Sequence, residues 1–192
     1  MTEPTAPAGD APMTENDRRL AYVPPESGAL GRLIHRVGPF FAAGFVVSMA
    51  ILIIEIVLRY VFHAPTLWAH ETTIFICAVN FVFGGLYCAA KDRHIRVVLI
   101  YDYVSPRVRR WLDVVISLTC ALSAGFFAYA SFLMVERAVW RPDGAFRLET
   151  TGSAWNPPTP ALVKVFLLFV LLVLCVQFLI LAWNHATKST KD

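Results

Sequence analysis

The chain has 192 residues, of which 57% are hydrophobic and 16% are charged, and its formal net charge is +3. Soluble globular proteins have roughly 45–50% apolar and about 25% charged residues, so this composition argues against an ordinary soluble enzyme. The small net charge gives no indication of nucleic-acid binding. The four cysteines show no CxxC spacing and no cluster with histidine, so the sequence predicts neither a disulfide framework nor a zinc site.

The N-terminal segment differs from the rest of the chain. Residues 1–30 combine acidic residues with many prolines, and no apolar run follows the first methionine, unlike a signal peptide. Such a segment cannot bury enough apolar surface to fold, so we expect 1–30 to be a disordered cytoplasmic tail. We expect a membrane domain over 31–185 and a short cytoplasmic tail over 186–192.

Four apolar segments follow, and each is long enough for a helix that crosses the bilayer, which takes about 20 residues. They run from about Val37 to Phe62, from Thr72 to Ala90, around Val114 to Val135, and from Leu162 to Ala182. Unpaired backbone groups are costly in lipid, so helices are the expected spanning structure. The sequence therefore predicts an all-α, polytopic membrane protein with four transmembrane helices.

Local signals refine the last two spans. Ser105–Pro106 and Thr159–Pro160 are typical of a helix N-cap followed by the first helical residue. A third helix from Pro106 to Trp140 would have about 35 residues and be about 52 Å long. It would exceed the ~30 Å hydrocarbon core, so we expect it to tilt or project from the membrane. The mixed basic and apolar loop before it predicts a short helix lying in the interface.

Basic residues predict the orientation. The N-terminal segment has four, the loop between the second and third helices has six and the C-terminal tail has two, whereas the other side has five. Because cytoplasmic loops carry the excess of Lys and Arg, we expect both termini in the cytoplasm. The five tryptophans all fall near the ends of the spans, as interfacial tryptophans do.

Among the polar residues of the spans, Glu55, Asn80 and Gln177 are singled out, because ionisable and polar groups in a membrane are candidates for function. Arg59 follows Glu55 at i+4, and this spacing favours an ion pair within the helix. The alternative is that Glu55 carries a proton or a cation. We expect Asn80 and Gln177 to form hydrogen bonds between helices.

Small residues at helical spacing predict where helices approach one another closely. In the second helix they form the pairs Gly84/Cys88 and Gly85/Ala89. In the third helix they form one row with a second row beside it: Ser117, Ala121 and Gly125, with Ala124 and Ala128.

The sequence contains no nucleotide-binding, hydrolase or zinc-protease motif, so we expect no catalytic residue, no metal and no cofactor. The histidines lie at the ends of the spans, whereas a membrane haem needs facing ligands within them. A haem-bearing anchor that uses His63 and His70 is kept as an alternative. Four spans without central charges make a poor carrier alone, so the residues favour an accessory or scaffold subunit.

Several short motifs in fixed order carry a family resemblance. They are Arg59-Tyr60-Val61-Phe62, Trp68, Glu71, Gly84-Gly85, His94-Ile95-Arg96-Val97, Pro106 and Trp111. Over about Gly38–Trp183 the chain resembles the small permease subunit of the tripartite ATP-independent periplasmic (TRAP) transporters. It departs from that family at Val98, where an Asp often follows the HIRV motif.

The resemblance implies a function without catalysis in the bacterial inner membrane. TRAP transporters are secondary carriers that import organic acids and related solutes, usually with sodium. The implied partners are the large permease subunit, a periplasmic solute-binding protein and the lipid bilayer, with no nucleic acid. The resemblance places Arg59, Trp68 and Glu71 at the outer hairpin, where they would fix its shape or contact a partner, and His94 and Arg96 in a cytoplasmic motif.

The outer loop over 138–159 is the candidate docking segment for the periplasmic partner. It has charges of both signs, two tryptophans and a pair of prolines. The alternative is a plain connector, since loops carry function when a rigid scaffold positions them. The candidate docking residues are Trp140, Arg141, Asp143, Arg147 and Trp155.

Overall fold

The computed structural model describes residues 24, 27–91, 105–140 and 144–187. Within them are four helices that are long and apolar enough to cross a membrane: α2 (Gly28–Tyr60), α3 (Trp68–Ala90), α5 (Pro106–Val139) and α6 (Thr159–Thr187). This part of the chain has no strand, only an isolated bridge between Trp140 and Phe146. The all-α architecture with four candidate spans is confirmed.

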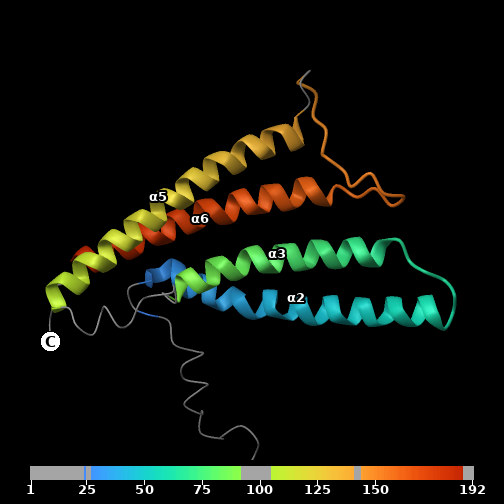
Figure 1. Ribbon diagram of the computed structural model, residues 1–192, viewed down its shortest axis with the longest axis horizontal. Helices are drawn as coiled ribbons and strands as arrows, with labels where there is room; N and C mark the ends of the chain where they lie inside the picture. Colours follow the sequence, from blue (N-terminus) through green and yellow to red (C-terminus); the bar gives the residue numbers. More distant parts are fainter. Residues whose placement is uncertain (1–23, 25–26, 92–104, 141–143, 188–192) are drawn as a thin grey trace, which may run out of the picture.

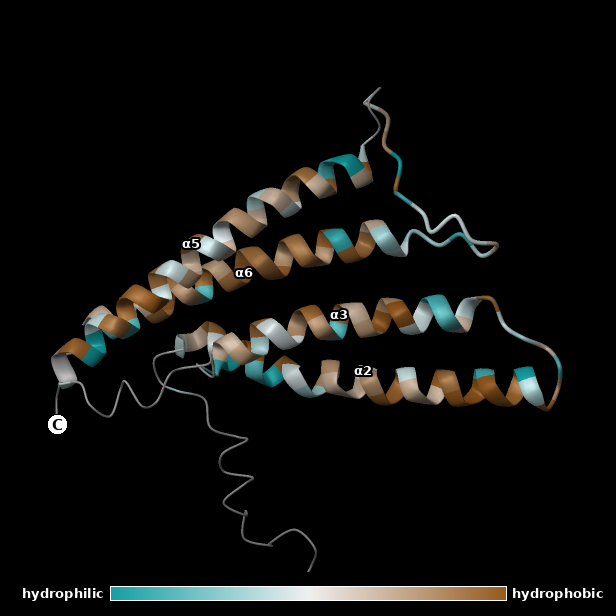
Figure 2. Ribbon diagram, viewed as in Figure 1, coloured by the Kyte–Doolittle hydropathy of each residue, from teal (hydrophilic) through white to brown (hydrophobic). Residues whose placement is uncertain are grey.

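The helices form two antiparallel hairpins (Figure 1). α2 packs along α3, α5 packs along α6, and the α3–α6 contact joins the two hairpins. We call the end where α2 and α5 begin and α3 and α6 finish the terminal end, and the opposite end the hairpin end. Figure 2 shows apolar residues along the middle of the helices, with hydrophilic residues gathered toward their ends. This is the distribution that a bilayer favours.

The helices extend further than the apolar segments alone indicated. α2 begins at Gly28 and α6 ends at Thr187, so both continue past the predicted spans at the terminal end. In α2 the added turns contribute Leu30 and Ile34 to a core cluster with α3 and α6. This tertiary packing stabilises the helical conformation of these turns. The expected tail over 1–30 lies largely outside the described residues, as does the expected interfacial helix.

The start of α5 follows its sequence signal only in part. Pro106 is the first helical residue, as expected, but the Ser105 side chain forms no capping hydrogen bond. α5 has 34 residues, which is about 51 Å of helix. It is inclined to α2 and α3 in Figure 1, as a helix longer than the hydrocarbon core is expected to be.

The two hairpins are held together by apolar clusters near the terminal end. One cluster is formed by α2, α3 and α6, and the rings of Phe41 and Phe83 stack beside it with centroids 3.8 Å apart. The other is formed by α3, α5 and α6, around Ala89, Ala121 and Leu181. Because α2 packs mainly along α3 and α5 mainly along α6, most of their large apolar side chains are exposed and available to lipid or to partners.

Candidate partner-binding surfaces

Glu55 fastens the connection between α2 and α3 at the hairpin end. The residue is buried near the end of α2, and the guanidinium of Arg59 donates a 2.7 Å hydrogen bond to its Oε1. The backbone N–H of Thr66 donates to Oε2 at 3.1 Å, and the Thr66 hydroxyl donates to the same oxygen. Both carboxylate oxygens are thus occupied. Sequence reasoning anticipated the Arg59 pair but missed Thr66, because no spacing rule links a helix to its following loop.

Glu71 joins the two hairpins at this same end. It lies in the first turn of α3, and the hydroxyl of Thr151 donates to its Oε2 at 3.2 Å. Trp68 begins α3 and is exposed. These two residues of the family motifs therefore have different roles. Arg59 stabilises the α2–α3 connection, and Glu71 binds the connection between α5 and α6.

The connection from α5 to α6 first folds back on the end of α5. The N–H groups of Arg147 and Glu149 donate to the carbonyls of Val139 and Ala138 at 2.9 and 2.8 Å. The ring of Trp140 meets that of Phe146 edge-on, with centroids 5.8 Å apart. Trp140 and Arg147 also line a hollow of about 280 Å³. Of the candidate docking residues, these two are therefore brought together.

The same connection then forms a tight turn that carries Trp155. The N–H of Gly152 donates to Asn156 Oδ1, and the N–H of Asn156 donates to Ser153 Oγ, each at 3.0 Å. Gly152 and Asn156 have φ values of +72° and +52°, which glycine and asparagine tolerate best. Trp155 sits inside this turn and is 47% exposed. The other two candidate docking residues, Arg141 and Asp143, lie outside the described residues, as do His94 and Arg96.

The mid-span amides behave differently from each other. Gln177 is fully buried, and its Nε2 donates to the carbonyl of Ser27 at 3.2 Å, while the Ser27 hydroxyl donates to the carbonyl of Ala90. Asn80 is buried against Gly44, but its Nδ2 has no hydrogen-bond partner within the described chain. The bond of Gln177 therefore runs from α6 to the residue that precedes α2 rather than between two helices, and none forms at Asn80 Nδ2.

The expected small-residue contacts are only partly those of the structure. A Cβ atom added at Gly84 or Gly85 would meet nothing within 4 Å, so no helix of the described chain packs closely there. On α5 the buried row differs from the expected one and leaves Gly125 out; it is Ser117, Ala121, Ala124, Ala128 and Ser131. Periodicity gives the face of a helix to within about one residue, and the crossing with α6 selects the row.

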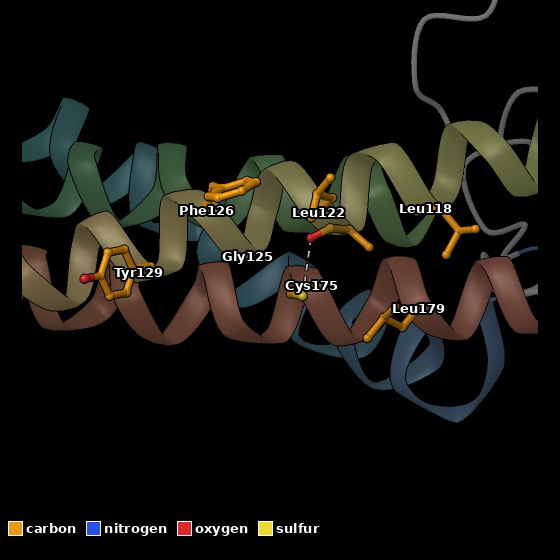
Figure 3. Close-up of a pocket in the computed structure, with 8 residues that line it drawn as sticks. Leu118, Leu122, Gly125, Phe126, Tyr129, Cys175 and Leu179 are labelled. Atoms are coloured by element: carbon orange, nitrogen blue, oxygen red, sulfur yellow. Dashed lines mark hydrogen bonds between the residues drawn. The ribbon is translucent and has the colours of Figure 1, made fainter.

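A groove of about 550 Å³ lies beside this row, between α5 and α6 (Figure 3). Its lining is almost wholly apolar, with Leu122, Gly125 and Phe126 from α5 and Leu179 from α6. Cys175 donates a weak hydrogen bond to the carbonyl of Ala121, 3.5 Å away across its floor. The groove lies at mid-span and suits apolar chains rather than a polar solute.

The family model described as "Tripartite ATP-independent periplasmic transporters, DctQ component" matches residues 48–188. The chain belongs to this DctQ family. The matched part of the DctQ chain runs from the middle of α2 to the end of α6 and includes Glu55, Glu71 and Trp155.

A curated relative agrees with this assignment. The "C4-dicarboxylate TRAP transporter small permease protein DctQ" of Vibrio cholerae serotype O1 is 26% identical over 121 residues, which cover 59% of this chain and 52% of the relative. The chain thus spans about half the length of the curated relative that it matches. No solved structure matches. The resemblance seen in the sequence is confirmed: the chain belongs to a family of transporter components and has four helices that are long and apolar enough to cross a membrane.

Proposed function

We propose that the chain is the small subunit of a secondary transporter that imports an organic-acid-like solute, and that it acts as a scaffold rather than as the carrier. The family match over 48–188 is the observation that carries this proposal. The geometry of Glu55 supports it, because Arg59 and Thr66 occupy both carboxylate oxygens and leave none for a transported cation or proton. His63 and His70 are exposed at the hairpin end, so nothing in their placement favours the haem alternative.

The large permease subunit packs, on this proposal, against one side of α3. Ile74, Phe81, Gly85 and Cys88 are all exposed and lie on one face of this helix, which we call the open α3 face. Phe81 is 81% exposed, the largest value among the exposed large apolar residues. The glycine leaves room for a helix backbone to approach closely, as at packed interfaces within membranes.

Co-purification tests the large-subunit contact. The tagged chain, expressed with the other transporter components and extracted from its membrane, is expected to bring a large polytopic protein in stoichiometric amount. Gly85→Leu fills the open α3 face and is expected to lose this partner. Gly125→Leu is the matched control, since it fills free space on a different helix. A homodimer without a large partner, or equal effects of the two variants, would refute the proposal.

The periplasmic binding protein docks, on the same proposal, at the turn that carries Trp155. Four contacts support a rigid platform there: the Glu71 bond, the two bonds of Asn156 and the Glu149–Lys164 ion pair. A large exposed aromatic on a rigid turn is the kind of residue that dominates binding energy at interfaces. This proposal requires the hairpin end to face the periplasm, in agreement with the excess of basic residues at the terminal end.

Uptake assays with added binding protein test the docking turn. Trp155→Ala is expected to raise the binding-protein concentration needed for half-maximal uptake by about tenfold, the effect of losing an interface hot spot. Trp111→Ala removes an exposed tryptophan from the terminal end and is expected to leave that concentration unchanged. Equal values for wild type and Trp155→Ala would show that the binding protein docks elsewhere.

A further inference from the structure

The two ends of the molecule differ in charge. Among the side chains that the structure describes, the terminal end has five basic residues and one acidic residue, Asp113, whereas the hairpin end has four of each. The basic residues of the terminal end are Arg32, Arg36, Lys91, Arg109 and Arg110. The described part of this end therefore carries an excess of positive charge.

Most of these basic groups are already engaged within the protein. Arg110 donates to the carbonyls of His185 and Ala186, where α6 ends. Lys91 is buried, with its ammonium 4.9 Å from the centre of the Tyr87 ring. Arg109 also has an interaction partner.

Arg32 and Arg36 are the exception. Both are exposed, and neither guanidinium has a hydrogen-bond or ion-pair partner in the part of the chain that the structure describes. They lie one turn apart on α2 and, with Ala29 and Leu33, line a hollow of about 310 Å³. The spacing i, i+3, i+4, i+7 places all four residues on one side of the helix.

The surface next to this hollow is apolar. Along the same side of α2, one turn beyond Arg36 toward the hairpin end, Phe40 is 76% exposed. Leu33 is exposed between the two arginines. Within about 6 Å along the helix, the surface therefore changes from two guanidinium groups to large apolar side chains.

We propose that Arg32 and Arg36 bind the headgroup phosphate of an anionic phospholipid, with an acyl chain lying along Leu33 and Phe40. Guanidinium groups bind phosphate oxygens through paired hydrogen bonds. The exposed apolar side chains of Leu33 and Phe40 would contact the acyl chain of such a lipid. A soluble anion has no apolar part that could use this contact. The surplus of positive charge at this end selects an anionic over a zwitterionic lipid.

This site is separate from the proposed function and from the family match. Arg32 and Arg36 precede residue 48, where the match to the family model begins. They also lie on α2, away from the open α3 face and from the docking turn. Success or failure of the lipid proposal therefore leaves the subunit assignment unaffected.

Native mass spectrometry of the full-length chain tests the site. In micelles doped with equal phosphatidylglycerol and phosphatidylethanolamine, the wild-type chain is expected to retain phosphatidylglycerol preferentially. Arg32→Gln/Arg36→Gln is expected to weaken phosphatidylglycerol binding by about 30-fold, the effect of removing two basic groups. The phosphatidylethanolamine-bound fraction is expected to fall less, because the ammonium of that headgroup offsets the charge of its phosphate.

The matched control is Arg137→Gln/Arg147→Gln, which removes two arginines from the hairpin end and is expected to bind phosphatidylglycerol like wild type. Circular dichroism of each variant verifies that the helices remain. Equal phosphatidylglycerol binding by wild type and Arg32→Gln/Arg36→Gln would refute the proposal. Displacement of the lipid by inorganic phosphate, beyond the effect of chloride at the same ionic strength, would also refute it, because the site would then take a free anion.

Discussion

At the scale of single residues, the space around each glycine shows whether that position packs against another helix of the chain or is open to a partner. A Cβ added at Gly44 would lie 2.5 Å from Asn80 Nδ2, whereas one at Gly85 would meet nothing within 4 Å. We therefore expect Gly44→Ala to destabilise the α2–α3 hairpin by about 1–3 kcal/mol, as overpacking does. Gly85→Ala is expected to leave the stability of the isolated chain unchanged. Unfolding of the purified chain in detergent measures both variants, and equal stabilities would contradict this packing.

The Glu55 carboxylate allows a second prediction at this scale. Glu55→Gln removes the charge that Arg59 and Thr66 share, so the connection between α2 and α3 is expected to loosen. A scaffold with a looser tip still supports transport, so uptake by the assembled transporter is expected to remain close to wild type. Hydrogen exchange at Thr66 and solute uptake together measure this. Loss of uptake with an intact, assembled subunit would favour the carrier role for Glu55.

At the scale of helices, the α5–α6 contact depends on small residues. Ala124 is buried in the row that faces α6, and Gly125 beside it faces free space. Ala124→Leu is expected to push the helices apart at a cost of about 1–3 kcal/mol, while Gly125→Ala is expected to be neutral. The distance between spin labels on α5 and α6 reports the change. A larger effect of Gly125→Ala would show that the groove is filled by the chain itself.

The sequence could predict the part of each helix that crosses the bilayer, but not the turns whose helical conformation depends on packing against other helices. The four spans were predictable because length and hydropathy decide what crosses a bilayer. The added turns of α2 were not, because Ile34 is held there by packing against α3 and α6 rather than by a local signal. Likewise, the pairs at Gly84 and Gly85 gave a small-residue face but not its neighbour, since spacing along one helix does not specify which helix packs on it.

In the candidate site, too, contacts within one helix were predictable from the sequence, whereas contacts made by the connecting segments were not. The Glu55–Arg59 pair lies within one helix at i+4 and was predictable from spacing. The bonds from Thr66 to Glu55 and from Thr151 to Glu71 join residues 11 and 80 positions apart. Contacts of this kind depend on how the connections fold back over the helix ends, which no local pattern encodes.

At the scale of the whole molecule, the distribution of charge makes the orientation testable. The terminal end holds the surplus of basic groups, and positively charged ends remain in the cytoplasm. We expect Ala154→Cys, on the docking turn, to react with a membrane-impermeant maleimide once the outer membrane is permeabilised. Ala29→Cys, beside Arg32, is expected to react only after the inner membrane is disrupted. Both positions are exposed, so access rather than burial decides the reaction.

The four native cysteines set the background for this labelling. Cys77, Cys120 and Cys175 lie within the spanning helices and are partly buried, but Cys88 is exposed two residues before the end of α3. The labelling is therefore done in a variant whose four native cysteines are replaced by alanine, and that variant is the matched control and is expected to remain unlabelled. If Ala29→Cys reacted once the outer membrane was permeabilised, and Ala154→Cys only after the inner membrane was disrupted, the orientation would be the opposite of the expected one. The Trp155 turn would then face the cytoplasm, and docking of a periplasmic protein there would be excluded.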